Sequence, residues 1–285
     1  MTKLIDGKQV ANDLKVQIAS SVKKLIALGI TPGIAVILVG EDPASQIYVR
    51  NKQRAAEQLG IDSELINLPT TTSEAKLLAK IDQLNANPAI DAILVQAPLP
   101  AHINEERVQS AIAPEKDVDG FHPQNVGALY NNAKSYYPQA NTPRGIMTLL
   151  AEYMPDLVGK KALVIGRSIL VGRPMMAMLN NADATVTLAH RHTQDLDQLI
   201  ATADLIVVAV GEPHFLKMSA AKADAVVIDV GINRLEDGSL VGDVLDDMPD
   251  SAQLLTPVPG GVGPMTIAML MQTTIELARQ HSTFE

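Results

Sequence analysis

Hydrophobic residues along this chain follow two alternating patterns. Short apolar runs, typical of strands buried on both faces, lie at 33–40, 90–95, 162–165, 204–210 and 225–230. Residues 65–68 are a further short strand candidate, and the alternating, β-branched segment 184–189 predicts another strand. Apolar residues spaced three and four apart predict amphipathic helices at 10–28, 43–59 and 73–84, after 142, after 174 and from 265 onward. A further helix is expected as the crossover between the last two strands. Strands that alternate with helices predict an α/β fold of βαβ units with parallel sheets.

A change of pattern divides the chain. Residues 126–137 lack clear periodicity and predict an irregular junction between two domains. We expect a first α/β domain of residues 1–140, completed by the C-terminal helix 265–285. The second domain, residues 141–264, is expected to be a Rossmann-type, doubly wound parallel sheet.

Composition narrows the function classes. With 285 residues, 47% of them hydrophobic, the chain can bury one large or two medium cores. The net charge of −9 argues against nucleic acid or an anionic membrane as the main partner. The absence of cysteine excludes disulfides and thiolate chemistry. We find no signal peptide, no apolar run near the ~20 residues of a membrane span and no metal-binding pattern, so we expect a cytoplasmic protein without a metal.

The stretch 161–174 carries the candidate chemistry of the second half. Its sequence, Lys-Ala-Leu-Val-Ile-Gly-Arg-Ser-Ile-Leu-Val-Gly-Arg-Pro, predicts a strand, a glycine turn and a helix, which together present backbone N–H groups to a phosphate. Ser168 replaces the second glycine of the dinucleotide fingerprint G-x-G-x-x-G, so a plain structural turn explains the match nearly as well. Gly166, Arg167 and Ser168 are the candidate phosphate contacts.

The ends of neighbouring strands indicate how a dinucleotide would be held. Arg191 lies 25 residues after Gly166, close to the interval of about 20 at which a dinucleotide fold meets the adenosine ribose. An arginine there accommodates the 2′-phosphate of NADP, whereas NAD favours an acid. Gly211 and Gly231 end two further strands and allow close backbone approach. Ile232 follows, either beside a nicotinamide ring or as ordinary core.

The candidate chemistry of the first half lies on one helix and two loops. Tyr48 and Lys52 are four residues apart on the predicted helix and share a face, although such a pair is usually surface decoration. Gln96 follows the apolar run 90–95, at the carboxyl end of a strand, where α/β folds place ligands. Asp119 lies in an acidic loop, where it either caps a turn or binds the amino N–H donors of a ring.

The segment 256–264 packs three glycines and three prolines into nine residues. A flexible linker would not be so rich in proline, so we expect an ordered loop that leads into the last helix. Gly260 and Gly261 offer backbone without side chains to a flat ligand.

Five motifs occur in a fixed order along the chain. They are Tyr48-x-x-x-Lys52, Gln96-x-Pro-Leu-Pro100, Lys116-Asp-Val-Asp-Gly-Phe-His-Pro123, Gly166-Arg-Ser-x-x-Val-Gly-x-Pro174 and Pro257-Val-Pro-Gly-Gly-Val-Gly-Pro-Met-Thr266. Together they resemble the bifunctional methylenetetrahydrofolate dehydrogenase/cyclohydrolase family, the FolD type, over almost the whole chain. That family often has Leu at the position of Ala97 and Cys at that of Asn141, and neither position is expected to do chemistry.

The resemblance implies a bifunctional enzyme of one-carbon metabolism. It would oxidise 5,10-methylene-tetrahydrofolate with NADP and hydrolyse the 5,10-methenyl product to 10-formyl-tetrahydrofolate, in a cleft between two domains; a homodimer is also implied. The implied substrate-binding residues are Tyr48, Lys52, Gln96, Pro98, Leu99, Asp119, Pro259, Gly260 and Gly261. The implied cofactor-binding residues are Gly166, Arg167, Ser168, Arg191, Gly211, Gly231 and Ile232.

The resemblance also implies individual roles. Lys52 would be the general base, because desolvation and a cationic ligand both disfavour its ammonium form. Gln96 would hold the amine by a hydrogen bond, and Tyr48 would stack on the folate or orient it. Asp119 would bind the amino group and ring N–H of the pterin.

Three other interpretations use some of the same residues. Short-chain dehydrogenases also carry Tyr-x-x-x-Lys, but after the glycine turn, whereas here the pair precedes the turn by more than a hundred residues. A dehydrogenase without hydrolase activity would keep Lys52 protonated and idle, and the presence of Gln96 favours two activities. A nucleotide-sensing module would leave the Pro-Gly-Gly loop and the acidic loop unexplained.

Overall fold

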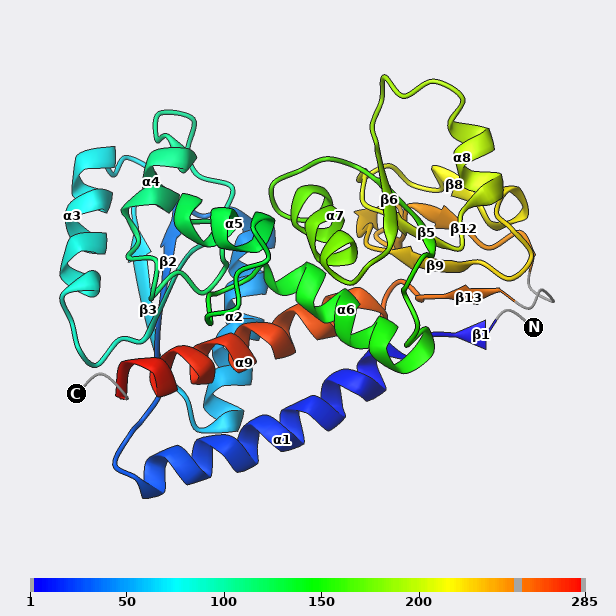
Figure 1. The fold of residues 1–285 in the computed structure, drawn as a ribbon. Coiled ribbons are helices and arrows are strands. Elements are labelled where there is room, and N and C mark those ends of the chain that lie inside the picture. Colours follow the sequence, from blue (N-terminus) through cyan, green and yellow to red (C-terminus); the bar gives the residue numbers. More distant parts are fainter. Residues whose placement is uncertain (1–2, 249–252, 283–285) are drawn as a thin grey trace. The chain divides into compact units, whose positions relative to one another are not determined.

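The computed structural model describes residues 3–248 and 253–282, which form two compact units (Figure 1). Unit 1 comprises the described residues up to Asn12 and from Thr142 to Thr266, and unit 2 those from Asp13 to Asn141 and from Ile267 onward. The N-terminal residues thus belong to unit 1, not to the domain predicted over 1–140, because β1 (Lys3–Leu4) pairs with β13 (Leu254–Leu255). Among the helices of these residues, none is long and apolar enough to cross a membrane.

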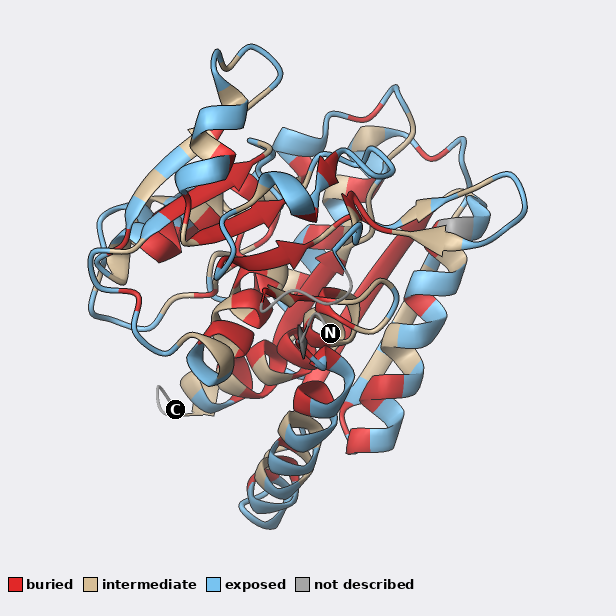
Figure 2. Ribbon diagram, turned by 90° about the vertical axis from the view of Figure 1, so that its right-hand side faces the viewer, coloured by how far each residue is buried: buried red, intermediate tan, exposed pale blue. Residues whose placement is uncertain are grey.

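Unit 2 is built on a three-stranded parallel sheet in the order β3-β2-β4. The strands are β2 (Gly33–Val39), β3 (Asp62–Leu68) and β4 (Ala92–Val95). Alternate side chains of β2 point to opposite faces of the sheet. One face packs with α1, α2 and α9 and the other with α3 and α4. β2 and β4 are accordingly buried, whereas the edge strand β3 is partly exposed; buried residues are red in Figure 2. The helices are α1 (Gly7–Ala27), α2 (Pro43–Leu59), α3 (Glu74–Asn85), α4 (Glu105–Ala111) and α9 (Val262–Ser282).

Caps confirm the predicted limits of the helix that carries Lys52. α2 begins at Pro43 after Asp42, whose carboxylate accepts a backbone N–H of the first turn at 2.8 Å. It ends at Gly60, whose φ of 78° only glycine adopts readily. These limits place Tyr48 and Lys52 one turn apart within a continuous helix.

Unit 1 has a six-stranded, wholly parallel sheet in the order β1-β13-β9-β7-β5-β6. Its remaining strands are β5 (Lys161–Ile165), β6 (Thr185–Ala189), β7 (Leu205–Val208) and β9 (Val226–Asp229), and its helices α6 (Asn141–Tyr153), α7 (Gly172–Asn181) and α8 (Leu196–Thr202). The chain runs from β5 to β6 on one side and returns to β7 on the other. This reversal makes a topological switch point at the carboxyl end of β5, where doubly wound folds bind ligands.

The crossover between β7 and β9 is not the helix that the pattern predicts. It contains β8 (Leu216–Lys217), which pairs with β12 (Val244–Leu245), and a 3₁₀ turn, Met218–Ala220. Gly211 and His214 have φ values of 71° and 58°, in the left-handed region, which interrupts an α-helix. A second short pair joins β10 (Asn233–Arg234) to β11 (Leu240–Val241).

The expected junction also differs in detail. The prediction of irregular chain over 126–137 is wrong for its first part, because α5 (Pro123–Tyr130) covers it, with His122 as its cap. Asn132 has a φ of 50°, which ends regular structure there. α6 begins at Asn141, slightly before the helix predicted after residue 142.

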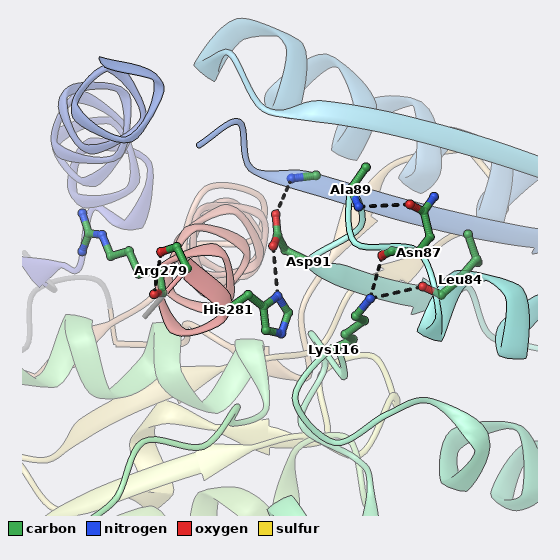
Figure 3. Close-up of polar contacts among 9 residues, drawn as sticks. Leu84, Asn87, Ala89, Asp91, Lys116, Arg279 and His281 are labelled. Carbon is green, nitrogen blue, oxygen red and sulfur yellow. Dashed lines mark hydrogen bonds and ion pairs between the residues drawn. The ribbon is translucent and has the colours of Figure 1, made fainter. Parts of the chain in front are cut away.

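Figure 3 shows how polar side chains fasten unit 2 near the amino ends of its strands. Asp91 precedes β4, and its carboxylate accepts the N–H of Gly33 at 2.9 Å and lies 3.0 Å from Nδ1 of His281 on α9. Lys116 donates to the carbonyls of Leu84 and Asn87 at 3.3 and 2.8 Å. These groups hold the C-terminal helix and a loop at the end of the sheet opposite to the strands' carboxyl ends.

Candidate active site

Lys52 and Gln96 meet at the carboxyl end of β4. Lys52 Nζ donates to Gln96 Oε1 at 2.9 Å, and Gln96 Nε2 donates to the carbonyl of Ala97 at 2.7 Å. The second bond turns the amide oxygen toward the lysine, because the nitrogen is already engaged. The backbone N–H of Gln96 continues the ladder to the carbonyl of Ile37 on β2, at 2.9 Å. The amine is therefore held by a neutral acceptor mounted on the sheet.

The environment of Lys52 favours its neutral form. Burial lowers the pKa of Lys52, and the negative charge of Asp119 opposes part of that shift. A neutral amine has a lone pair that accepts a proton, whereas an ammonium group has none. This half-buried lysine is therefore suited to act as a base.

Asp117 and Asp119 lie in the loop between α4 and α5 and have different surroundings. Asp117 is buried; it forms an isolated parallel bridge with Ile93, and its carboxylate accepts the His122 N–H at 2.7 Å and the Asn125 amide at 2.9 Å. Burial raises the pKa of Asp117 to about 6, although these bonds favour its charged form. Asp117 thus holds the loop through its hydrogen bonds.

Asn141 contacts Asp119 directly. Its side-chain nitrogen donates to Asp119 Oδ1 at 3.1 Å and its side-chain oxygen accepts from Thr273 on α9 at 2.9 Å. From the sequence we expected no chemical role for Asn141 and did not single out Thr273. Neither the contact of Asn141 with Asp119 nor that with Thr273 follows from spacing along the chain.

The other predicted folate residues divide between the units. Tyr48 is 44% exposed on α2, and Pro98 and Leu99 follow Gln96 in unit 2. Pro259, Gly260 and Gly261 lie in unit 1. A Cβ at Gly261 would overlap Pro257 and Thr256, at 2.7 Å from an atom of each, whereas a Cβ at Gly260 would meet only Pro257, at 3.8 Å. Of the two glycines, Gly260 therefore presents open backbone, and Gly261 is required by packing inside the protein.

The glycine turn of unit 1 is tightly packed. Gly166 has a φ of 116°, and a Cβ there would overlap the carbonyl of Ala209; a Cβ at Gly172 would overlap the carbonyl of Gly166. The two glycines let strand, turn and helix approach closely. Arg167 and Ser168 between them are exposed, at the N-terminal side of α7, where anions are favoured.

Asp243 joins two of the predicted cofactor loops. Its Oδ2 accepts the N–H groups of Val210 and Gly211 at 2.8 and 2.9 Å. Its Oδ1 accepts the N–H of Glu212 at 3.0 Å and the amide of Asn233 at 2.8 Å. This buried carboxylate holds the loops after β7 and β9 together, and the Gly211 N–H points into the protein rather than toward a ligand.

Asp229 fixes the backbone of Asp243 by a hydrogen bond. Its carboxylate accepts the N–H groups of Gly231, Asp243 and Val244, each at 2.9 Å. Burial raises the pKa of Asp229 to about 6, against these three bonds. Sequence reasoning missed both acids, although an acid inside the apolar run Ala225–Val230 was a usable signal.

Replacing Asp243 with asparagine should weaken cofactor binding. Asparagine has the shape of aspartate but only one acceptor oxygen. Two of the four donors would therefore face an NH₂ group. We expect the KM for the dinucleotide to rise about tenfold. Steady-state kinetics of the oxidation test this, with Asp247→Asn as control, because Asp247 accepts from the exposed Ser219, at 2.8 Å for its N–H, and not from the loops that Asp243 joins. An unchanged KM in Asp243→Asn would contradict the prediction.

Arg191 is exposed at the turn after β6. Its Nε donates to Nε2 of His192 at 3.2 Å, and the His192 N–H donates to the ring of His190 at 3.2 Å. Arg191 follows β6, which pairs in parallel with β5. It therefore lies at the carboxyl ends of the strands, as do Arg167 and Ser168, which follow β5. Such exposed cationic and hydroxyl donors fit the phosphates of NADP. No group of three or more metal-ligating side chains occurs within the described ranges.

Two family models match the chain. The catalytic domain of tetrahydrofolate dehydrogenase/cyclohydrolase matches residues 5–119, and the NAD(P)-binding domain matches residues 140–282. The chain belongs to this family. It is a bifunctional enzyme that oxidises 5,10-methylene-tetrahydrofolate with NADP and hydrolyses 5,10-methenyl-tetrahydrofolate to the 10-formyl form, as the motifs predict.

Individual relatives agree over nearly the full length. The bifunctional protein FolD of Lactiplantibacillus plantarum is 59% identical over 280 residues, which are 98% of each chain. The crystal structure of FolD from Campylobacter jejuni is 45% identical with a TM-score of 0.95, covering 98% of this chain and 99% of that one. FolD from Trypanosoma brucei, solved with NADP cofactor and an inhibitor, is 34% identical with a TM-score of 0.93, over 98% of both chains. The predicted α/β fold with two domains is thereby confirmed.

Proposed function

We propose that unit 2 carries the folate chemistry, with Lys52 as the general base of the hydrolysis, and that unit 1 binds NADP. The observation that carries this proposal is the 2.9 Å hydrogen bond from Lys52 to Gln96. A neutral partner holds the amine without adding the negative charge that would keep it protonated. The methenyl cation adds a like charge and lowers the pKa of Lys52 further.

The hydrolysis needs one base and a bound water molecule. Lys52 accepts a proton from water while the water oxygen bonds to the cationic carbon between the two folate nitrogens. The bond from this carbon to N5 then breaks, N5 takes the hydroxyl proton, and the formyl group stays on N10. One proton leaves through the Lys52 ammonium. Gln96 orients the amine, Tyr48 stacks on the folate or orients it, and Asp119 accepts N–H groups of the pterin.

The oxidation depends on positioning. NADP, when bound, supplies the hydride acceptor. The two nitrogens beside the reacting carbon absorb its positive charge, so the chain supplies alignment rather than acid or base. The residues proposed to hold NADP are Gly166, Arg167, Ser168, Arg191, Gly231 and Ile232, together with Gly211, which offers its open Cα side because its N–H is bonded to Asp243. Those proposed to line the folate are Pro98, Leu99, Pro259, Gly260 and Gly261.

We also propose that the protein works in the cytoplasm as a homodimer. There it would supply one-carbon units for purine, methionine and histidine synthesis. The resemblance to the family supports these points. Sedimentation of the purified chain tests the dimer.

One assay separates this function from its alternatives. Protein is mixed with NADP and 5,10-methylene-tetrahydrofolate, and NADPH and methenyl absorbance are followed together. We expect NADPH without a persistent methenyl signal. A methenyl signal that persists would leave a dehydrogenase with an idle Lys52, and no NADPH would leave a nucleotide-sensing module.

A further inference from the structure

We propose that Asn141 is a positioning residue of the folate site: it aims the Asp119 carboxylate at the substrate and preserves its negative charge. The inference rests on the proposed function of Asp119 and Lys52. Asn141 is 5% exposed, at the start of α6 and within unit 2. A buried amide in this position must satisfy its polar atoms inside the protein.

Each polar atom of the Asn141 side chain is engaged. Nδ2 donates to the carbonyl of Val118 at 2.9 Å and to Asp119 Oδ1 at 3.1 Å. Oδ1 accepts from the hydroxyl of Thr273, a fully buried residue of α9, at 2.9 Å. The Val118 carbonyl can only accept, so it fixes the nitrogen end of the amide on the side of Asp119, and the hydroxyl of Thr273 meets the oxygen end. Asn141 therefore holds both the backbone before Asp119 and the carboxylate itself.

The charge of Asp119 depends on few neighbours. Burial raises the pKa of Asp119, and this is the largest influence; Lys52 from α2 and the hydrogen bond from Asn141 lower it. Asp117, in the same loop, is the other acid that interacts with Asp119, and Thr273 brings a hydroxyl from α9 without a charge. The hydrogen bond from Asn141 thus opposes the rise that burial gives to the pKa of Asp119, and it does so whether or not Lys52 is protonated.

Loss of Asn141 should affect folate binding in a pH-dependent way. An ionised carboxylate accepts two N–H donors of the pterin, whereas a protonated one presents an O–H to one of them. Without Asn141 the carboxylate protonates at higher pH and loses its fixed orientation. We expect Asn141→Leu to raise the KM for folate about tenfold and to shift upward the pH below which that KM increases.

A second asparagine of unit 2 is a matched control. Asn85 donates to the carbonyl of Ala111 at 2.8 Å and accepts the N–H of Ala113 at 2.9 Å. Asn141→Leu and Asn85→Leu should both lower Tm, because both leave buried backbone groups unpaired. Only Asn141→Leu should shift the midpoint pH of the curve that plots the folate KM against pH. A midpoint equal to that of the wild type would overturn the proposal.

Two further variants keep the outcomes distinct. Should Asn141→Leu not fold, Asn141→Ser removes the same amide with a smaller change, and its midpoint should move in the same direction. Asp119→Asn tests the proposed function itself, which fails at this residue if the folate KM is unchanged. If Asp119→Asn raises that KM while the Asn141 variants keep the wild-type midpoint, only the present inference fails.

Discussion

Replacing Lys52 with methionine is expected to lower kcat for methenyl-tetrahydrofolate hydrolysis by about 10²- to 10⁴-fold, the usual contribution of a general base. NADP-dependent oxidation should keep most of its rate, because it needs alignment rather than proton transfer. Methionine matches the length of lysine and removes only the amine and its hydrogen bond to Gln96. Separate assays of the two steps measure the effect.

The pH dependence of hydrolysis gives a second test of Lys52. Only the neutral amine accepts a proton, so the wild-type rate should rise with pH as Lys52 loses its proton. Burial lowers the pKa of Lys52, so the rise should level off below about 10.4, the ordinary value for lysine. The methionine variant should lack this rise.

Lys116 supplies a matched control for Lys52. Burial lowers the pKa of Lys116 as well, but its amine donates to the backbone carbonyls of Leu84 and Asn87. Lys116→Met should cost stability and leave the ratio of the two activities unchanged. Equal loss of both activities in Lys52→Met would refute its role as the base.

Arg191→Asp is expected to weaken NADP binding by about tenfold to a hundredfold, the range for losing charge-assisted hydrogen bonds to a phosphate. Binding of NAD should change far less, because NAD lacks the 2′-phosphate that the guanidinium is proposed to hold. The KM values for both dinucleotides in the oxidation assay measure this preference.

Arg234 provides the control for net charge. It is exposed in unit 1, where its guanidinium donates to the carbonyl of Gly238 at 2.9 Å. Arg234→Asp changes the net charge of the unit equally, so any general electrostatic effect appears in both variants. If Arg191→Asp keeps the preference of the wild type for NADP, the 2′-phosphate lies elsewhere.

The sequence was informative where a role depends on short-range pattern. The helical spacing of Tyr48 and Lys52 and the place of Gln96 after an apolar run put these residues on known elements, and the hydrogen bond between Lys52 and Gln96 is present in the structure. The central strands β2, β4, β5, β7 and β9 were likewise predictable, because a strand buried on both faces is a continuous apolar run.

The rest could not be predicted because it depends on contacts between side chains and distant backbone. Asp243 accepts N–H groups from residues 31 to 33 positions away, and a backbone donor has no sequence signature. The pairing of β1 with β13 is also invisible in two-residue strands. A helix was wrongly predicted before β9 because crossover segments are usually helical, whereas Gly211 and His214 turn the chain.

The pairing of β1 with β13 affects how the protein folds during synthesis. Lys3 is synthesised long before Leu254, the residue with which it pairs in the sheet. α9, which supplies Leu270, Met271 and Ile275 to the core of unit 2, emerges later still. Domains commonly fold one after another during synthesis. Here unit 1 is completed by β13 and unit 2 by α9, and both are made late. A nascent polypeptide of this enzyme therefore spends most of translation with β1 unpaired and the core of unit 2 incomplete, and a premature stop before β13 would remove β13 from unit 1 and α9 from unit 2.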